Sequence, residues 1–273
     1  MSRAPRERTS VEQALELLRA AGPAQLADAV VATDFDGTLA PIVDEPAESR
    51  LLPGAEQVLL RLHRAVGEVA VVSGRPLGFL QDHCPPGITL VGLYGLESVR
   101  GGVRADHPTA GVWRETLADL ATAGTRHGPE GMRVESKGLS LTLHYRGRPE
   151  LAAQVHDYAA EAAQVAGLHL RPARMSVELH PPIDEDKGTV LERLASAHSG
   201  PVLYLGDDVG DLPAFDALDR LEDAGRTTLR VVAGSDEMSP ELATRADLLL
   251  GGPPAVLGFL TLLADLVGTP PPV

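Results

Sequence analysis

Short apolar runs, each followed at once by polar residues, constrain the fold of this chain most strongly. Three of them are residues 29–33 (AVVAT), 68–72 (EVAVV) and 202–205 (VLYL). Shorter runs of the same kind occupy residues 88–91, 229–232 and 247–250. Helical patterns lie between the runs, and apolar runs of this length are typical of strands buried on both faces. The alternation predicts an α/β fold, a doubly wound (Rossmann-like) parallel sheet with helices on both sides.

The pattern changes between residues 96 and 183. Gly101-Gly102 predicts a hairpin turn, and a helical pattern covers about residues 109–123. Leu139, Leu141 and Leu143 then alternate with polar residues, which predicts an antiparallel strand with one wet face. A second helix and two more strands follow, so residues 96–183 are expected to form an inserted α+β domain. Residues 1–95 and 184–273 would form the core domain, with a proline-rich tail at 269–273.

Charge and targeting signals narrow the possible partners. The 24 basic and 38 acidic residues give a net charge of −14, which argues against nucleic acid as a partner. The single cysteine, Cys84, excludes an internal disulfide. Residues 1–10 lack the apolar core of a signal peptide, and the apolar stretch at 248–264 is interrupted by Gly-Gly-Pro-Pro. We therefore expect a cytoplasmic protein without a membrane partner.

Paired carboxylates follow the first apolar run. Asp34 and Asp36 are two residues apart, so strand geometry lets them point the same way. Their mutual repulsion is relieved by a divalent cation, and with Asp207 nearby the oxygen ligands suit Mg²⁺. A calcium-binding EF-hand loop is rejected, because it needs Gly where Leu39 stands and a helix where the apolar run stands. A plain acidic loop is disfavoured, because Asp34 directly follows an apolar strand.

Two further polar segments suit a phosphoryl group. Ser73-Gly74 follows the second run, where a hydroxyl and free amides could hold phosphoryl oxygens; taken alone, Ser73 is more typical of a simple cap. Lys187 lies at a helix start, the unfavourable end for a cation unless an anion binds there. A solvated lysine beside the acids at 184–186 is the alternative. The chain has only two lysines, Lys137 and Lys187, against 22 arginines, which favours a role that needs a compact ammonium group.

These segments, in this order, resemble the haloacid dehalogenase-like phosphatases. The shared segments are residues 34–39 (DFDGTL), 73–75 (SGR), 187–188 (KG) and 206–208 (GDD). Within that superfamily the chain is similar to the trehalose-6-phosphate phosphatases over about residues 30–263. The segments that resemble this family in particular, within the superfamily, are 40–42 (API), 92–97 (GLYGLE), 134–137 (VESK), 144–146 (HYR) and 177–179 (VEL).

The resemblance implies a role for each matching residue. Asp34 would be the nucleophile that forms an aspartyl-phosphate, and Asp36 the general acid and then base. Mg²⁺ would bind Asp34, the carbonyl of Asp36 and Asp207, with support from Asp208 or Asp211. Ser73, Gly74 and Lys187 would hold the phosphoryl oxygens. The insert would be a cap, and the sugar contacts would come from Arg75, Glu135, Lys137 and Glu178. Without the resemblance, Glu135 and Lys137 are typical of a solvated hairpin.

Two positions depart from the family pattern. Tyr94 stands where the family usually has His, and Leu212 where it usually has Glu. The expected reaction is Mg²⁺-dependent hydrolysis of trehalose 6-phosphate, in functional pairing with a trehalose-6-phosphate synthase. Action on another sugar or polyol phosphate is one alternative. A non-catalytic regulatory partner of a trehalose synthase is disfavoured because the catalytic residues are intact. A receiver domain is disfavoured by the large insert between Ser73 and Lys187.

Overall fold

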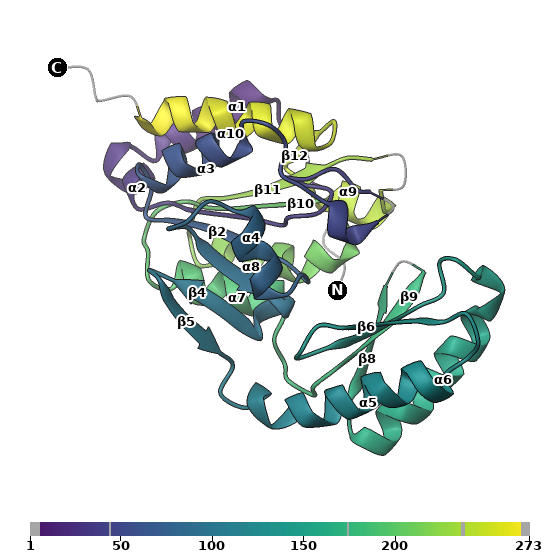
Figure 1. The fold of residues 1–273 in the computed structure, drawn as a ribbon. Coiled ribbons are helices and arrows are strands. Elements are labelled where there is room, and N and C mark those ends of the chain that lie inside the picture. The colour runs from purple at the N-terminus through teal and green to yellow at the C-terminus, as the bar shows by residue number, and fades with distance from the viewer. Residues whose placement is uncertain (1–5, 44, 174, 236–237, 269–273) are drawn as a thin grey trace. The chain divides into compact units, whose positions relative to one another are not determined.

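The chain forms two compact units. A computed structural model describes residues 6–43, 45–173, 175–235 and 238–268 (Figure 1), so the expected proline-rich tail lies outside the described residues. The core unit comprises Met1–Arg104 and Glu185–Val273, and the inserted unit comprises Ala105–Asp184. Within the described ranges, no helix is both long enough and apolar enough to cross a membrane.

An eight-stranded sheet organises the core unit. Its strands, in spatial order, are β12 (Leu248–Leu250), β11 (Thr228–Ala233), β10 (Val202–Gly206), β1 (Val30–Thr33), β2 (Glu68–Val72), β3 (Thr89–Gly92), β4 (Glu97–Arg100) and β5 (Val103–Asp106). The strands from β12 to β3 are parallel, and β4 pairs antiparallel with β3. This confirms the predicted α/β fold with a parallel-sheet core.

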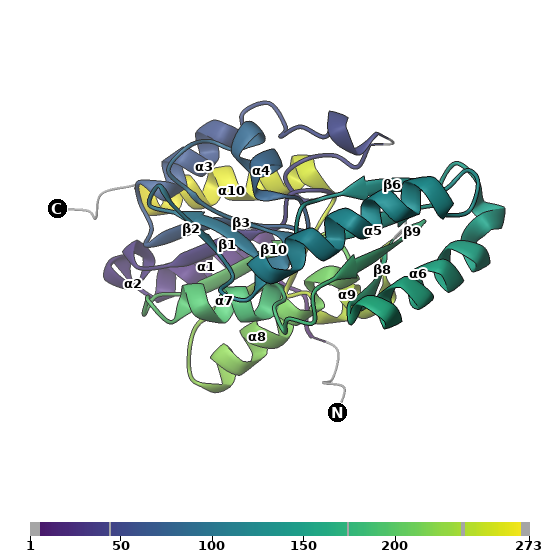
Figure 2. The same cartoon turned by 60° about the horizontal axis from the view of Figure 1, so that its bottom comes forward.

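Helices cover both faces of this sheet (Figure 1, Figure 2). Alternate strand residues point to opposite faces, so Val31 and Val69 join one apolar cluster while Val30 and Val202 join the other. The first cluster includes residues of α1 (Val11–Ala20), α3 (Ala55–His63), α4 (Leu77–His83) and α10 (Pro253–Gly268). The second includes residues of α7 (Lys187–Ala195), α8 (Leu212–Asp223) and α9 (Pro240–Arg245). A short helix, α2 (Pro23–Ala27), follows α1.

The β4–β5 hairpin belongs to the core sheet. Leu90 of β3 pairs with Val99 of β4, and β5 lies next to β4 at the sheet edge. Gly101 and Gly102 join the two strands with φ of 55° and 78°, the conformation that tight hairpin turns require. The structure therefore divides the chain after Arg104, whereas the sequence places the boundary after residue 95. The reason is that the hairpin extends the core sheet instead of starting the insert.

The inserted unit has its own sheet and its own apolar core. The sheet is antiparallel, in the order β6 (Arg133–Ser136), β7 (Leu141–His144), β9 (Ser176–His180) and β8 (His169–Ala173). Leu141 and Leu179 face α5 (Arg114–His127) and α6 (Ala152–Ala166), whose residues complete that core. The expected wet face is wrong for Ser140 and Thr142, which are 2% and 3% exposed. The buried hydroxyl of Ser140 is satisfied, because it donates to Glu178.

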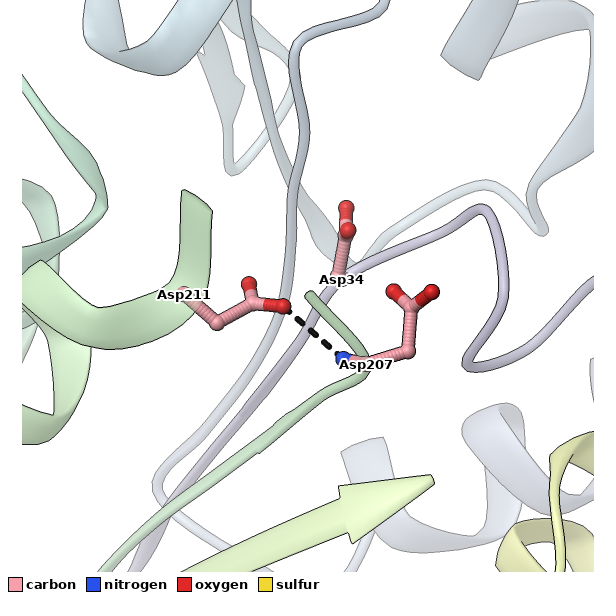
Figure 3. A group of neighbouring side chains, drawn as sticks. All are labelled: Asp34, Asp207 and Asp211. Atoms are coloured by element: carbon pink, nitrogen blue, oxygen red, sulfur yellow. Dashed lines mark hydrogen bonds between the residues drawn. The ribbon is translucent and has the colours of Figure 1, made fainter. Parts of the chain in front are cut away.

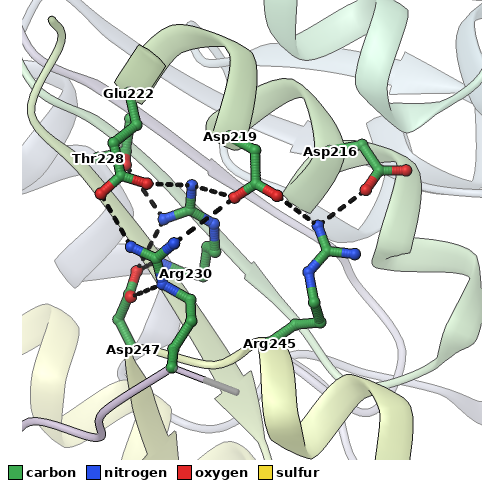
Figure 4. A network of polar contacts seen from close by, with 8 residues as sticks. Asp216, Asp219, Glu222, Thr228, Arg230, Arg245 and Asp247 are labelled. Atoms are coloured by element: carbon green, nitrogen blue, oxygen red, sulfur yellow. Dashed lines mark hydrogen bonds and ion pairs between the residues drawn. The ribbon is translucent and has the colours of Figure 1, made fainter. Parts of the chain in front are cut away.

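A charge network joins β11, β12 and α8 in the core unit (Figure 4). Arg230 of β11 is fully buried, and its guanidinium lies 2.6 Å from Asp219, 3.0 Å from Glu222 and 3.1 Å from Asp247. Arg6 contacts the same three carboxylates. Thr228 and Asp247 stand at the amino-terminal ends of β11 and β12, so the network lies at the edge of the sheet opposite the strand ends that carry Asp34 and Asp207.

Candidate functional site

The carboxyl ends of neighbouring parallel strands bring the predicted acids together. β1 lies between β10 and β2, so Asp34 follows the central strand while Asp207 and Ser73 follow its two neighbours. The backbone N–H of Asp34 donates to the carbonyl of Leu205 at 2.8 Å, which locks the ends of β1 and β10 in register. Open parallel sheets bind ligands at this edge. The core unit therefore presents its polar cluster where the sequence predicts it.

Lys187 is a buried cation between two carboxylates. Its Nζ lies 2.9 Å from Asp34 Oδ2 and 2.6 Å from Asp211 Oδ1, and the residue is 2% exposed. Asp186 caps α7 by accepting from the N–H groups of Gly188 and Thr189, each at 2.8 Å. Burial by itself lowers the pKa of Lys187, but Asp211 and Asp34 raise it well above the usual value. The alternative of a solvated lysine is therefore excluded.

Asp211 organises the ends of β10 and α7. Its Oδ1 accepts from Lys187 and, at 2.8 Å, from the Tyr204 hydroxyl. Its Oδ2 accepts from the N–H groups of Asp207 and Asp208 at 2.8 and 3.1 Å. Figure 3 shows the Asp207 bond and the way the Asp34, Asp207 and Asp211 carboxylates converge. Four donors occupy the oxygens of Asp211, so this residue supports the site, and Asp34 and Asp207 have more freedom to bind a ligand.

The donor set fits a divalent cation. One oxygen from each of Asp34, Asp207 and Asp211 lies within 4.8 Å of the others; Asp34 and Asp211 are buried, and Asp207 is 9% exposed. Three carboxylates against the single ammonium of Lys187 leave excess negative charge. Burial, followed by the charges of Asp34 and Asp211, raises the pKa of Asp207 to about 9. Hard oxygen ligands with uncompensated charge suit Mg²⁺.

The turn after β1 presses close against this cluster. Gly37 has φ of 72°, and a Cβ placed there would lie 1.9 Å from Asp207 Oδ2. Glycine is required at this turn for its conformation and for the close approach. Thr38 also faces Asp207, with its hydroxyl 3.5 Å from Oδ1.

Asp36 and Asp208 stand outside the carboxylate cluster. The Asp36 side chain accepts from Arg75 Nε at 2.6 Å, from a second Arg75 nitrogen at 2.8 Å and from the Ser49 hydroxyl at 2.8 Å. The Arg75 guanidinium in turn lies over the Phe79 ring, 4.4 Å from its centre. Asp208 is exposed and caps the following turn by accepting from Gly210 N–H. Asp34 and Asp36, which are expected to point the same way, thus take different partners: Asp34 contacts Lys187, and Asp36 contacts Arg75 and Ser49.

Ser73 and Gly74 lie at the end of β2. Ser73 is 3% exposed, and its Oγ accepts from Arg75 N–H at 3.3 Å, so it serves as a cap and keeps its own proton to donate. A Cβ on Gly74 would lie 2.6 Å from the ring of Tyr94. Tyr94, which departs from the family pattern, therefore packs directly against the segment expected to hold phosphate.

Three of the four expected sugar contacts lie in the inserted unit, whereas Arg75 lies in the core unit. Glu135 of β6 and Glu178 of β9 flank Thr142 of β7 in the register, so all three project from one face of the sheet. Lys137 Nζ lies 3.7 Å from Glu178 Oε1. His144 Nε2 lies 2.8 Å from Glu135 Oε2, a contact that the sequence analysis did not anticipate.

Several site residues were missed by sequence reasoning. Tyr204 is the one polar residue in the VLYL run, which is a usable signal, and burial raises its pKa well above the usual value, so it stays protonated and donates to Asp211. Ser49 and Phe79 carry no such signal, because only the tertiary structure brings them to Asp36 and Arg75.

Comparison with known proteins gives a consistent assignment. The trehalose-phosphatase family model matches residues 32–250. A trehalose-phosphate phosphatase of Mycobacterium ulcerans is 32% identical over 247 residues, which cover 86% of this chain and 61% of that protein. One from Mycobacterium bovis is 34% identical over 210 residues, covering 71% of this chain and 54% of that protein. The chain thus spans just over half the length of these curated relatives.

Solved structures agree on the fold. The C-terminal domain of Candida albicans trehalose-6-phosphate phosphatase has a TM-score of 0.76 at 23% identity, covering 97% of this chain and 99% of that one. The C-terminal domain of a Candida albicans trehalose synthase regulatory protein has a TM-score of 0.64 at 15% identity, covering 93% and 98%. The family model spans most of the chain, including both units and the cluster around Lys187. The chain belongs to the trehalose-phosphatase family.

Proposed function

We propose that this chain is a Mg²⁺-dependent phosphatase that hydrolyses trehalose 6-phosphate to trehalose and phosphate. The observation that carries the proposal is the buried Lys187 ammonium between Asp34 and Asp211, beside Asp207. Family membership and the names of the curated relatives support the substrate. A glycosyl-transfer enzyme that makes trehalose 6-phosphate, such as a trehalose-6-phosphate synthase, would supply this substrate.

In the proposed mechanism Asp34 is the nucleophile. A carboxylate oxygen of Asp34 attacks phosphorus, the bond from phosphorus to the sugar oxygen breaks, and Asp36 gives a proton to the leaving oxygen. Water then attacks the aspartyl-phosphate, Asp36 takes its proton, and phosphate leaves. Lys187 holds a phosphoryl oxygen and neutralises its charge. Mg²⁺ bound by Asp34, the Asp36 carbonyl and Asp207 would neutralise further charge on the phosphoryl group.

We propose for Arg75 a different role from the sugar contact that the resemblance implies. Its guanidinium is engaged by both Asp36 oxygens and stacked on Phe79. We therefore assign Arg75 to positioning Asp36, which must leave this ion pair and take up a proton before it can act as the acid. Ser73 and Gly74 remain the proposed phosphate contacts, and Glu135, Lys137 and Glu178 the proposed sugar contacts.

A phosphate-release assay across sugar phosphates, with and without Mg²⁺, tests the proposal. Trehalose 6-phosphate should be preferred over glucose 6-phosphate, activity should require Mg²⁺, and Asp34→Asn should abolish it. Asp82→Asn, which changes an exposed aspartate on α4, is the matched control and should behave as wild type. A fully active Asp34→Asn enzyme would refute the mechanism, and an equal rate on glucose 6-phosphate would refute the substrate.

A non-catalytic regulatory role is the second candidate. The C-terminal domain of a Candida albicans trehalose synthase regulatory protein shares this fold, which supports the candidate. Asp34, Asp36, Lys187 and Asp207 are all present here, which favours catalysis. Wild-type protein without Mg²⁺-dependent phosphate release on any sugar phosphate would favour the regulatory role.

A further inference from the structure

A short segment after β3 packs against the turn that follows β2. The segment is the 3₁₀ turn Leu93–Gly95, and the turn after β2 is residues 73–75. The backbone N–H of Tyr94 donates to the carbonyl of Ser73 at 3.1 Å, and that of the residue before it donates to the carbonyl of Arg75 at 3.0 Å. Both ends of the turn are therefore tied to the segment, and all of these residues belong to the core unit.

The ring of Tyr94 lies directly against Gly74. A Cβ on Gly74 would lie 2.6 Å from a ring carbon of Tyr94 and 2.6 Å from its hydroxyl oxygen, which is closer than a Cβ can approach. Gly74 does not have a left-handed φ, so glycine is needed at this position for the close approach and not for its conformational freedom. The ring thus fills the space that a side chain at position 74 would take.

The backbone of the segment is held in an unfavourable conformation. Leu93 and Tyr94 have φ of 49° and 58°, in the left-handed region that residues with side chains rarely adopt. Such conformations persist where the surrounding structure imposes them, and they cluster at functional sites. Leu93 is 2% exposed, so its burial and the two hydrogen bonds to the turn hold the segment in this conformation.

The same segment also lies against the start of α7, the helix that carries Lys187. A Cβ on Gly95 would lie 2.7 Å from Glu185 Oε2 and 3.0 Å from a side-chain carbon of Val190. Glu185 Oε2 in turn accepts from the Thr189 hydroxyl at 2.9 Å. The segment therefore contacts both elements of the core unit that supply the proposed phosphate contacts.

We infer that Tyr94 is a positioning residue of the phosphate site: its ring packs on Gly74 and fixes the turn that presents Ser73 and Gly74 to the phosphoryl group. The inference rests on the proposed function, of which it needs the phosphate site and not the identity of the sugar. Tyr94 then acts equally on every phosphate monoester, so it sets the affinity for phosphate and leaves the preference among sugars unchanged.

The first test removes the ring and measures the inhibition constant of inorganic phosphate, with Mg²⁺. Tyr94→Ala should raise that constant and lower kcat/KM about tenfold for trehalose 6-phosphate and glucose 6-phosphate alike, because small misplacements of binding groups have effects of this size. The ratio of the two kcat/KM values should stay that of wild type. Tyr94→Phe keeps the ring and should lose much less.

Three results would overturn the inference. One is an unchanged inhibition constant of phosphate in Tyr94→Ala. The second is a change in the ratio of the two kcat/KM values, which would mean that Tyr94 acts on the sugar. The third is an equal loss in Tyr94→Phe and Tyr94→Ala, which would assign the effect to the hydroxyl and not to the ring.

A double-mutant cycle tests the contact itself. Gly74→Ala places a Cβ against the Tyr94 ring and should lower kcat/KM, whereas the double variant with Tyr94→Ala should regain about tenfold over Gly74→Ala, because residues in contact couple. Additive losses would show that the two residues act independently and would overturn the inference. Gly78→Ala on α4 is the matched control, since nothing lies within 4 Å of its added Cβ, and it should keep wild-type kinetics.

Failure of the proposed function is recognised separately. Wild type that releases no phosphate from any sugar phosphate overturns the proposed function and the inference with it. An equal rate on glucose 6-phosphate refutes only the substrate, and the inhibition constant of phosphate still decides the inference. Where thermal denaturation shows Gly74→Ala to be unfolded, the inhibition constant in Tyr94→Ala decides.

Discussion

At the scale of single residues, the site depends on the size of one cation. Lys187 is 2% exposed and touches Asp34 and Asp211 at 2.9 and 2.6 Å. A guanidinium keeps the charge, but it is planar and larger than an ammonium, so it displaces one of the two carboxylates. We expect Lys187→Arg to lower kcat by about 100-fold or more, because misplaced charge near the reacting atoms costs that much.

Steady-state kinetics on trehalose 6-phosphate measure this effect. Arg61→Lys, which exchanges the same two residue types at an exposed ion pair on α3, serves as the control and should keep wild-type kinetics. Near-normal turnover in Lys187→Arg would show that the site tolerates either cation. The presence of lysine at position 187 would then have no functional reason.

Proton binding by the carboxylate cluster couples stability to pH. Burial raises the pKa of Asp34 to about 7 and that of Asp207 to about 9, both above the value of about 3.9 for an unfolded chain. The folded metal-free protein therefore binds more protons than the unfolded chain between about pH 4 and pH 9. The stabilisation of the folded protein by proton binding at Asp34 and Asp207 is complete below about pH 4. It is lost as the pH rises through 7 and 9.

Mg²⁺ reverses this trend, because it binds the ionised carboxylates. In thermal denaturation experiments, Tm with Mg²⁺ should exceed Tm with EDTA, and we expect this difference to grow from pH 6 to pH 9. Asp207→Asn removes the group with the higher pKa and should flatten that dependence. A Mg²⁺-induced shift of Tm that is the same at every pH would contradict this linkage.

Which acids meet at the strand ends was predictable, and which partner each acid takes was not. Asp34, Asp207 and Lys187 converge because β1 and β10 are adjacent and parallel, and the apolar runs before the two acids indicate those strands. The pairing of Asp36 with Arg75 and Ser49 depends on loop conformations that strand periodicity does not specify. The same holds for Asp211, whose four donors come from α7, β10 and the turn after β10.

At the scale of elements, the buried Arg230 holds β11, β12 and α8 together. Removing one partner of a buried ion network leaves uncompensated charge and costs about 3–5 kcal/mol. We expect Arg230→Met to lower the free energy of unfolding of the core unit by about that amount, because Asp219, Glu222 and Asp247 lose a shared cation.

Urea denaturation followed by circular dichroism measures the loss. Arg220→Met is the control: Arg220 pairs with Glu192 on the surface, where an ion pair contributes about 0–1 kcal/mol. Equal effects of the two substitutions would mean that Arg6 and solvent replace the charge of Arg230.

Strands were easier to predict than helices. The six apolar runs of the core match β1, β2, β3, β10, β11 and β12, because strands buried on both faces need continuous apolar residues. The helices α2, α4, α8 and α9 were not predicted. Three of them have seven residues or fewer, so they give little periodicity, and α8 begins directly after the acidic cluster, which hides its start. The helix expected over residues 109–123 begins at Arg114, after a 3₁₀ turn at Ala110–Trp113.

At the scale of the whole molecule, the two units have separate apolar cores. The inserted unit buries its own cluster under α5 and α6, and the carboxylate cluster belongs entirely to the core unit. A ligand stabilises only the folded unit that binds it. We expect calorimetry to show two transitions, of which only one moves to higher temperature when Mg²⁺ is added. Equal shifts of both transitions, or one transition throughout, would contradict independent units.

The parallel pairing of β1 with β10 has a consequence for how such a chain can change. Val30 pairs with Val202, so the segment between them forms one long closed loop that contains the inserted unit. The entropy of closing a loop grows only with the logarithm of its length, by about 0.6 kcal/mol for each doubling. The inserted unit can therefore be enlarged, trimmed or exchanged at this crossover while the strand ends that carry Asp34 and Asp207 stay in place.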